Sequence, residues 1–145
     1  MGSRSPGATV TPARSDAVFL AIIAALHLLI GGGHQYAHGV AEVGNTPLQI
    51  LFILIVITIA PWAAVYLAWI RSLRIGAILF SAAMAASFFF GLVFHFAFES
   101  PDLYSNVVPE YRDLFLHSAL GLALVEFAGF VYGAHLVLKW RQPNG

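Results

Sequence analysis

The chain contains no cysteine, so it can form no disulfide, no thiolate zinc site and no iron–sulfur cluster held by cysteines. Any metal ion that it binds must therefore use nitrogen and oxygen ligands. Charged side chains are also scarce, at 10% of 145 residues compared with roughly 25% in soluble proteins. The 7 basic and 7 acidic residues cancel. Without a basic excess or patch, we expect no nucleic-acid partner.

Familiar catalytic motifs are missing as well. The sequence has no glycine-rich phosphate loop with a lysine, no serine nucleophile elbow and no His-Glu-x-x-His motif. It therefore designates no catalytic residue and leaves open whether the protein is an enzyme.

Apolar residues make up 59% of the chain and gather in four long runs. Each run has about the 20 residues that a helix needs to cross the hydrocarbon core of a bilayer. We predict an all-α integral membrane four-helix bundle, formed by one transmembrane domain over residues 17–138. The predicted spans cover residues 17–38, 48–70, 75–98 and 114–138.

The segments outside the predicted domain are polar. Residues 1–16 contain Gly2, Pro6 and Pro12 and predict a flexible N-terminal arm, and residues 139–145 predict a short tail. A cleaved signal peptide is the competing interpretation of the first apolar run. We reject it because the run continues into a histidine segment without a small-residue cleavage site.

Basic residues indicate how the bundle lies in its membrane. Six of them fall on one predicted side, and only Arg112 falls on the other. These six are Arg4, Arg14, Arg71, Arg74, Lys139 and Arg141. Because basic loops stay cytoplasmic, both termini are expected in the cytoplasm of a bacterial or archaeal cell, with the bundle in the inner membrane.

Two features of the spans predict their shape and packing. Pro61 should distort the second span, since proline removes a backbone donor. Small residues from Gly76 to Ala86 in the third span, and Gly129 with Gly133 in the fourth, should let neighbouring helices approach closely.

Three pairs of ligand-type residues sit near the predicted outer boundary, each pair four residues apart. The pairs are His34 with His38, His95 with Glu99, and Asp113 with His117. Residues at this spacing share one helix face, one turn apart. Imidazole and carboxylate suit zinc, copper or iron, so all six side chains are candidate ligands of a transition-metal site between the helices.

A haem is the alternative cofactor. Haem b could be held by two of His34, His38, His95 and His117, since glycines near these histidines leave room for a flat macrocycle. A pigment on one intramembrane histidine also remains open. The simplest alternative has no cofactor, because interfacial histidines can hydrogen-bond to loop carboxylates and lipid headgroups.

His27 and Glu126 lie near the middle of their spans, where ionisable groups are rare. Together they could relay protons between the outer side and the interior. The alternative is a protonated Glu126 that only donates a hydrogen bond to a neighbouring helix.

Two hypotheses of function follow. In the first, the protein uses an outer-side metal or haem site for metal handling or electron transfer. In the second, it is a non-catalytic accessory subunit of a larger respiratory, photosynthetic or oxidase complex. Its expected partners are the lipid bilayer and either other membrane subunits or further copies of itself.

Overall fold

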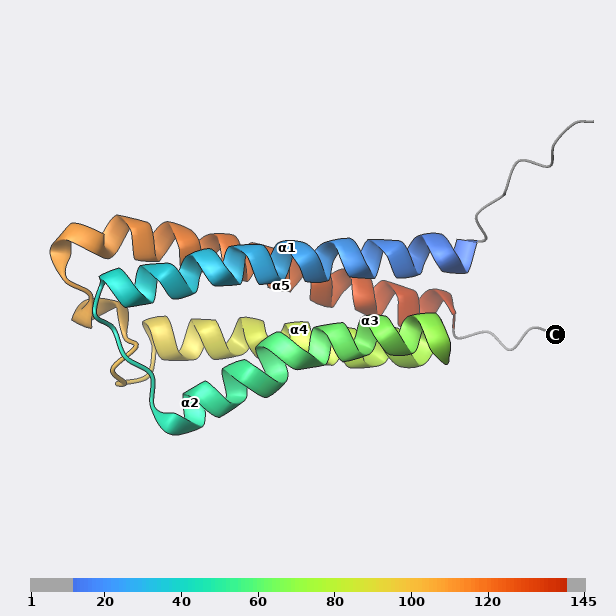
Figure 1. Ribbon diagram of the computed structural model, residues 1–145, viewed down its shortest axis with the longest axis horizontal. Coiled ribbons are helices and arrows are strands. Elements are labelled where there is room, and N and C mark those ends of the chain that lie inside the picture. Colours follow the sequence, from blue (N-terminus) through green and yellow to red (C-terminus); the bar gives the residue numbers. More distant parts are fainter. Residues whose placement is uncertain (1–11, 141–145) are drawn as a thin grey trace, which may run out of the picture.

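The computed structural model describes residues 12–140. All regular secondary structure in this range is helical, and loops connect the helices (Figure 1). Four segments are long and apolar enough to cross a membrane, which confirms the predicted all-α, four-helix class. The elements are α1 (Pro12–Val40), α2 (Pro47–Phe52), η1 (Ile53–Ile59), α3 (Ala60–Ile70), α4 (Leu73–Phe96), η2 (Tyr104–Asn106), η3 (Pro109–Tyr111) and α5 (Arg112–Lys139). The second segment is continuous and consists of α2, η1 and α3.

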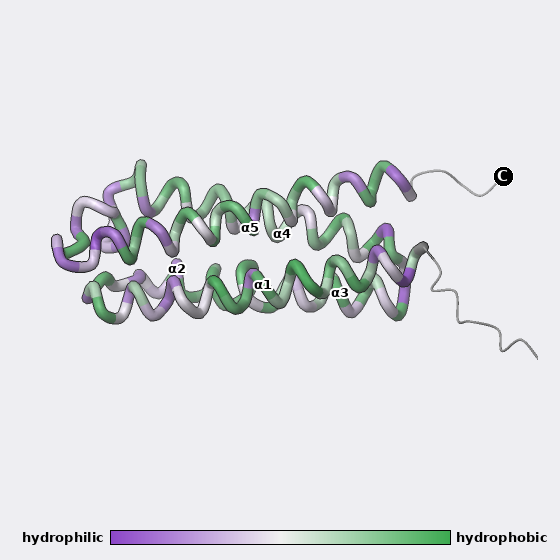
Figure 2. Tube along the Cα trace, turned by 90° about the horizontal axis from the view of Figure 1, so that it is seen from above, coloured by the Kyte–Doolittle hydropathy of each residue, from purple (hydrophilic) through white to green (hydrophobic). Residues whose placement is uncertain are grey.

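The four segments lie side by side as a bundle, and the longest connection, residues 97–111, joins α4 to α5 (Figure 1). The start of α1 and the end of α5 lie at one end of the bundle, here called the terminal end. The opposite end, which holds His34, His38 and His95, is called the histidine end. Figure 2 shows hydrophilic stretches at both ends and hydrophobic helix between them, as expected for a bundle that crosses a membrane.

Helix α1 begins at Pro12, five residues before the predicted start of the first span. Proline suits the first helical turn, where its missing N–H is not needed. Asp16, placed by the prediction in a flexible arm, is instead buried and accepts hydrogen bonds from Lys139 Nζ at 2.8 Å and Trp140 Nε1 at 2.9 Å. Residues 1–11 and 141–145, the rest of the predicted arm and tail, lie outside the described residues.

The second segment starts with a capping box. Thr46 Oγ1 accepts from the Gln49 backbone N–H at 3.3 Å, and Gln49 Oε1 accepts from the Thr46 N–H at 2.7 Å. Just before Pro61 the helix changes to the π form over η1. The segment bends there, and α2 diverges from α1 towards the histidine end (Figure 1). The predicted distortion at Pro61 therefore takes the form of a π-helical stretch.

Glycines bring the helices close together in the half of the bundle nearer the terminal end. A Cβ added to Gly76 would lie 2.6 Å from the backbone oxygen of Ala64, and one added to Gly133 would lie 3.0 Å from Cα of Ser81. A Cβ on Gly129 would lie 2.5 Å from Met84 Cε. These contacts confirm the close packing predicted from the small residues. The core around them includes the fully buried Leu20, Phe80, Met84 and Leu136.

Candidate metal centre

Helix α1 supplies two of the histidines and ends directly after them. His34 and His38 lie one turn apart and both face the interior, with relative exposures of 5% and 4%. The helix stops at Val40, and Glu42 takes a left-handed conformation with φ of 54°. The Val43 N–H then donates to the His38 carbonyl at 3.1 Å. This C-terminal cap fixes the position of the turn that carries His38.

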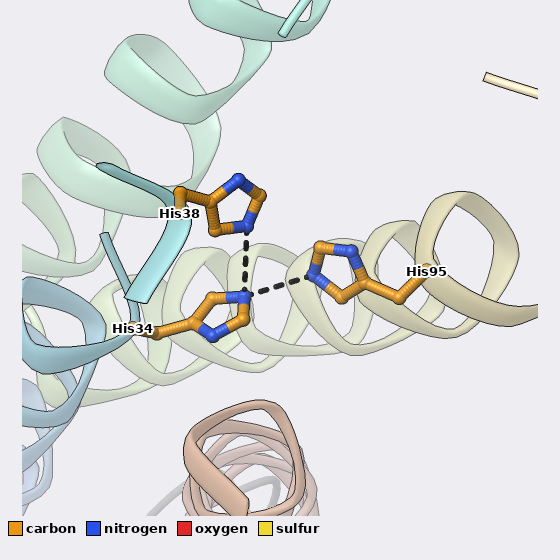
Figure 3. A group of neighbouring side chains, drawn as sticks. All are labelled: His34, His38 and His95. Carbon is orange, nitrogen blue, oxygen red and sulfur yellow. Dashed lines mark hydrogen bonds between the residues drawn. The ribbon is translucent and has the colours of Figure 1, made fainter. Parts of the chain in front are cut away.

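Helix α4 brings His95 against this pair from the other side. His34 Nε2 lies 3.0 Å from His95 Nε2 and 3.1 Å from His38 Nε2. One ligand nitrogen from each ring lies within 4.8 Å of the other two. Figure 3 shows the three rings pointing towards a common centre. Three buried imidazoles from two helices are thus arranged so that they can hold a metal ion.

Two of the rings have their other nitrogen engaged in a hydrogen bond. His34 Nδ1 lies 2.9 Å from Ser118 Oγ, and the Ser118 hydroxyl donates to the Phe115 carbonyl, also at 2.9 Å. The hydroxyl oxygen therefore accepts from His34 Nδ1–H. His95 Nδ1 faces two acceptors of Asp102, the backbone oxygen at 3.3 Å and Oδ2 at 3.2 Å. Both Nδ1 atoms accordingly carry the hydrogen, which leaves a lone pair on each Nε2.

Two of these nitrogens lie at hydrogen-bonding distance from each other. The Nε2 atoms of His34 and His95 are 3.0 Å apart. At this distance one ring can donate an N–H to the other, and two rings that both present lone pairs can instead share a cation. Ligands at ~2.05 Å around a tetrahedral ion are about 3.3 Å apart, which is close to the distances of His34 Nε2 from the other two Nε2 atoms.

Asp102 lies beside the histidines and contacts two of them. Its side chain is fully buried, and Oδ1 lies 3.3 Å from His38 Nε2. Among residues 12–140, neither carboxylate oxygen has a well-aligned hydrogen-bond donor. A buried carboxylate needs a compensating positive charge, which a protonated His38 or His95 or a bound ion would provide. The group of ligand atoms that lie within 4.8 Å of one another consists of the three histidines alone, and Asp102 borders it through His38 and His95.

Phe115 closes the cluster on the side of α5. Its ring is fully buried, and its centroid lies 5.1, 4.9 and 5.2 Å from those of His34, His38 and His95. An axially ligated haem needs two imidazoles on opposite faces of a flat macrocycle. Here the imidazole nitrogens are 3.0 Å apart and Phe115 packs against the rings, so the geometry suits a single ion better than a haem.

The structure does not bring the other three candidate ligands into the cluster. Glu99, Asp113 and His117 are exposed, and His117 Nδ1 lies 2.7 Å from the Asp113 carbonyl of its own helix. The buried face of α5 carries Phe115, Ala119 and Glu126. His117 precedes Glu126 by nine residues, which places it about 180° around the helix. The four predicted haem ligands are likewise divided, with His117 apart from the other three.

Three residues of the site were not predicted from the sequence. Asp102 lies in an irregular loop, where no periodicity reveals which side chains turn inward. Ser118 is next to His117 but about 100° further around the helix, on the side that faces α1. The position of Phe115 could have been predicted, because its spacing from Glu126 places both residues on the same face of the helix. If Glu126 points inward, Phe115 does so too.

The predicted pairing of His27 with Glu126 is present near the middle of the bundle. His27 Nε2 lies 3.2 Å from Glu126 Oε1, and the two side chains have relative exposures of 4% and 2%. The pair joins α1 to α5. It is separate from the histidine cluster, since His27 lies seven residues before His34, or about 10.5 Å along α1.

Comparison with known proteins adds no relative: no protein-family model matches the chain, and no curated protein or solved structure is significantly similar to it.

Proposed function

We propose that this chain is an integral membrane protein that binds one zinc, copper or iron ion and serves in metal handling. The ion is held by the Nε2 atoms of His34, His38 and His95 and by the carboxylate of Asp102. One observation carries the proposal: three buried imidazoles converge on one point, and two of them have their Nδ1 hydrogens committed to other acceptors. A cation is the natural partner for that arrangement.

The donor set favours metal handling over electron transfer. All four donors are nitrogen or oxygen atoms, which suit divalent ions of borderline character. Electron-transfer copper sites use a cysteine thiolate, and this chain has no cysteine. The thioether of Met84 is packed in the core beneath Gly129, far from the histidine end.

Charge distribution supports an outer location for the ion. Arg71 and Arg74 lie at the turn between α3 and α4, and Lys139 lies at the end of α5, all at the terminal end. By the positive-inside rule this end is cytoplasmic, which places the histidine end at the outer side. The proposed membrane is the inner membrane of a bacterium or archaeon.

The test is metal analysis of the full chain purified in detergent. The protein is stripped with a chelator, incubated with zinc, copper(II) or iron(II), passed through a desalting column and analysed for bound metal. We expect one ion per chain for at least one of these metals. His34→Ala, His38→Ala and His95→Ala should each abolish retention, because two remaining imidazoles leave the shell incomplete.

His117→Ala is the matched control, since His117 is another histidine of the same end but is exposed. It should retain the ion as the unaltered chain does. Equal retention by His95→Ala and His117→Ala would refute the proposed centre. A haem absorption band in protein as isolated would instead favour the haem alternative.

Membership of a larger membrane complex stays a prediction. Exposed apolar side chains such as Leu29, Tyr66 and Leu124 cover the outside of the bundle. A bilayer and a neighbouring subunit would cover them equally well. The size of the particle in mild detergent distinguishes a single chain from a homo-oligomer or a complex.

A further inference from the structure

A cavity of about 220 Å³ extends inside the bundle from the histidine cluster to the mid-membrane pair. His34, His95 and Asp102 line one end, and His27 and Glu126 line the other. Between these ends its walls are mainly apolar, with Phe90, Leu122 and Trp62 among them. The cavity therefore offers hydrogen-bonding groups at two ends of an apolar chamber about 10 Å long.

The cavity opens sideways, at the level of the membrane. Its lining includes Leu28 on α1 and Trp62 on α3, whose side chains are 50% and 40% exposed. Gly32 also lines it, and a Cβ added there would meet nothing within 4 Å. Across from α1 the lining is formed by Ile53 and Ile57 of η1, the segment through which α2 diverges from α1 (Figure 1). A molecule dissolved in the bilayer can thus reach the cavity without crossing water.

The cavity does not continue to the terminal end. Beyond Glu126, Gly129 packs tightly on Met84, and Gly133 packs on Ser81. Phe80 and Leu20 fill the bundle there and are fully buried. A chamber with a lateral entrance and a closed floor has the form of a binding site rather than a path across the membrane.

We infer that this cavity binds the ring of a lipid-soluble 1,4-quinone or hydroquinone. One ring oxygen hydrogen-bonds to the His27–Glu126 pair. The opposite oxygen lies towards the other end of the cavity, whose lining includes the side-chain amides of Gln35 and Asn45 as hydrogen-bond donors. The alkyl tail leaves between α1 and η1 into the lipid. The cavity is lined by side chains of the bundle alone, so this inference does not depend on the proposed metal function.

The polar groups select this class of ligand over other lipids. A fatty acid would place its carboxylate beside Glu126 or Asp102, and like charges repel in a low-dielectric site. An alcohol has a single polar group and would leave one end of the cavity unpaired. A quinone ring carries an oxygen on each of two opposite sides and is flat enough to pack on Phe90 and Trp62.

The experiment is fluorescence titration of the chelator-treated full chain in detergent with decylubiquinone. Trp62 lines the cavity, whereas Trp69 and Trp140 lie at the terminal end. We expect saturable quenching of the Trp62 fluorescence, which Trp62→Phe should remove. Quenching that rises linearly without saturation, or that persists in Trp62→Phe, would show only partitioning of the quinone into the micelle and would overturn the inference.

Two neighbouring glycines of α1 provide a matched pair of variants. Neither Gly32 nor Gly33 has an atom within 4 Å of an added Cβ, but only Gly32 lines the cavity. Gly32→Leu should weaken decylubiquinone binding at least tenfold, and Gly33→Leu should leave it unchanged. Equal effects of the two substitutions would overturn the inference.

The polar anchor is tested separately with Glu126. Glu126→Gln keeps a hydrogen-bonding group of the same size and should retain binding within a few-fold, whereas Glu126→Leu should weaken it at least tenfold. Binding to Glu126→Leu as tight as to the unaltered chain would refute the anchoring by this pair. Zinc, copper and iron retention, measured on the same preparations, reports independently on the proposed metal centre.

Discussion

His95 Nδ1 lies 3.2 Å from Oδ2 of Asp102, a residue seven positions further along the chain that the α4–α5 loop folds back beneath the ring. This contact turns His95 Nε2 towards His34 and His38. The same carboxylate reaches His38 Nε2 through Oδ1, at 3.3 Å. Asp102 is thus placed to orient His95 and to bring a negative charge beside the cluster.

Replacing Asp102 by asparagine should weaken metal binding about 10–100-fold, the usual effect of removing an orienting partner. The amide keeps the volume of the side chain but loses the negative charge that balances the ion. Competition with a chromophoric chelator measures the affinity. Asp113→Asn is the control, because Asp113 is exposed and lies outside the cluster. An unchanged affinity in Asp102→Asn would exclude Asp102 from the site.

A bound ion should stabilise the folded chain. An ion that binds only the native state at 100 times its Kd adds about 2.7 kcal/mol to the free energy of unfolding. The thermal midpoint, followed by circular dichroism in detergent, should therefore rise on metal addition and return when a chelator is added. His38→Ala should show no such rise. The same shift in this variant would place the binding elsewhere.

Alanine at Gly76 should destabilise the bundle more than alanine at Gly129. The added methyl at Gly76 meets the backbone of α3 at 2.6 Å, which cannot move without shifting the helix. At Gly129 it meets the end of the flexible Met84 side chain, which can rotate away. We expect the Gly76 substitution to reach the upper part of the range of about 1–3 kcal/mol for overpacking. Unfolding in mixed micelles compares the two, and the reverse order would contradict this account.

Glycine in place of Glu42 should stabilise the protein. Glu42 has φ of 54°, a left-handed conformation that is unfavourable for residues with a Cβ, and its side chain is exposed. Relief of this strain is expected to raise the free energy of unfolding by about 1 kcal/mol. Glycine at Glu110, an exposed residue of a regular turn, should bring no gain. A loss of stability in Glu42→Gly would show that the carboxylate has a role of its own.

Asp16→Asn should destabilise the terminal end of the bundle locally. Besides Lys139 and Trp140, the Tyr132 hydroxyl donates to this carboxylate, at 3.3 Å. Because the Lys139 side chain is 41% exposed, its ion pair is screened, and the loss should be about 1 kcal/mol. Faster hydrogen exchange of the last turn of α5, with the histidine end unchanged, would be the signature. An equal increase in hydrogen exchange at both ends of the bundle would contradict a local role of Asp16.

Local spacing predicted part of the candidate site. The four-residue interval between His34 and His38 guarantees that they share a face of any helix, and the structure turns that face inward. The same argument held for Asp113 and His117, which also share a face, but one that points outward. Spacing within a helix therefore shows which residues lie on the same face of that helix. It does not show whether they meet residues of another helix.

The sequence by itself determined the four apolar segments and the residue types available as ligands. Their length and hydropathy suffice for this, since a chain in lipid must satisfy its backbone within helices of membrane length. Only the tertiary structure decided the rotation of each helix, because rotation depends on which small residues meet, as Gly129 meets Met84 and Gly133 meets Ser81. It also decided the place of Asp102, because a loop without periodicity is positioned by the helices it joins and by the buried groups it contacts.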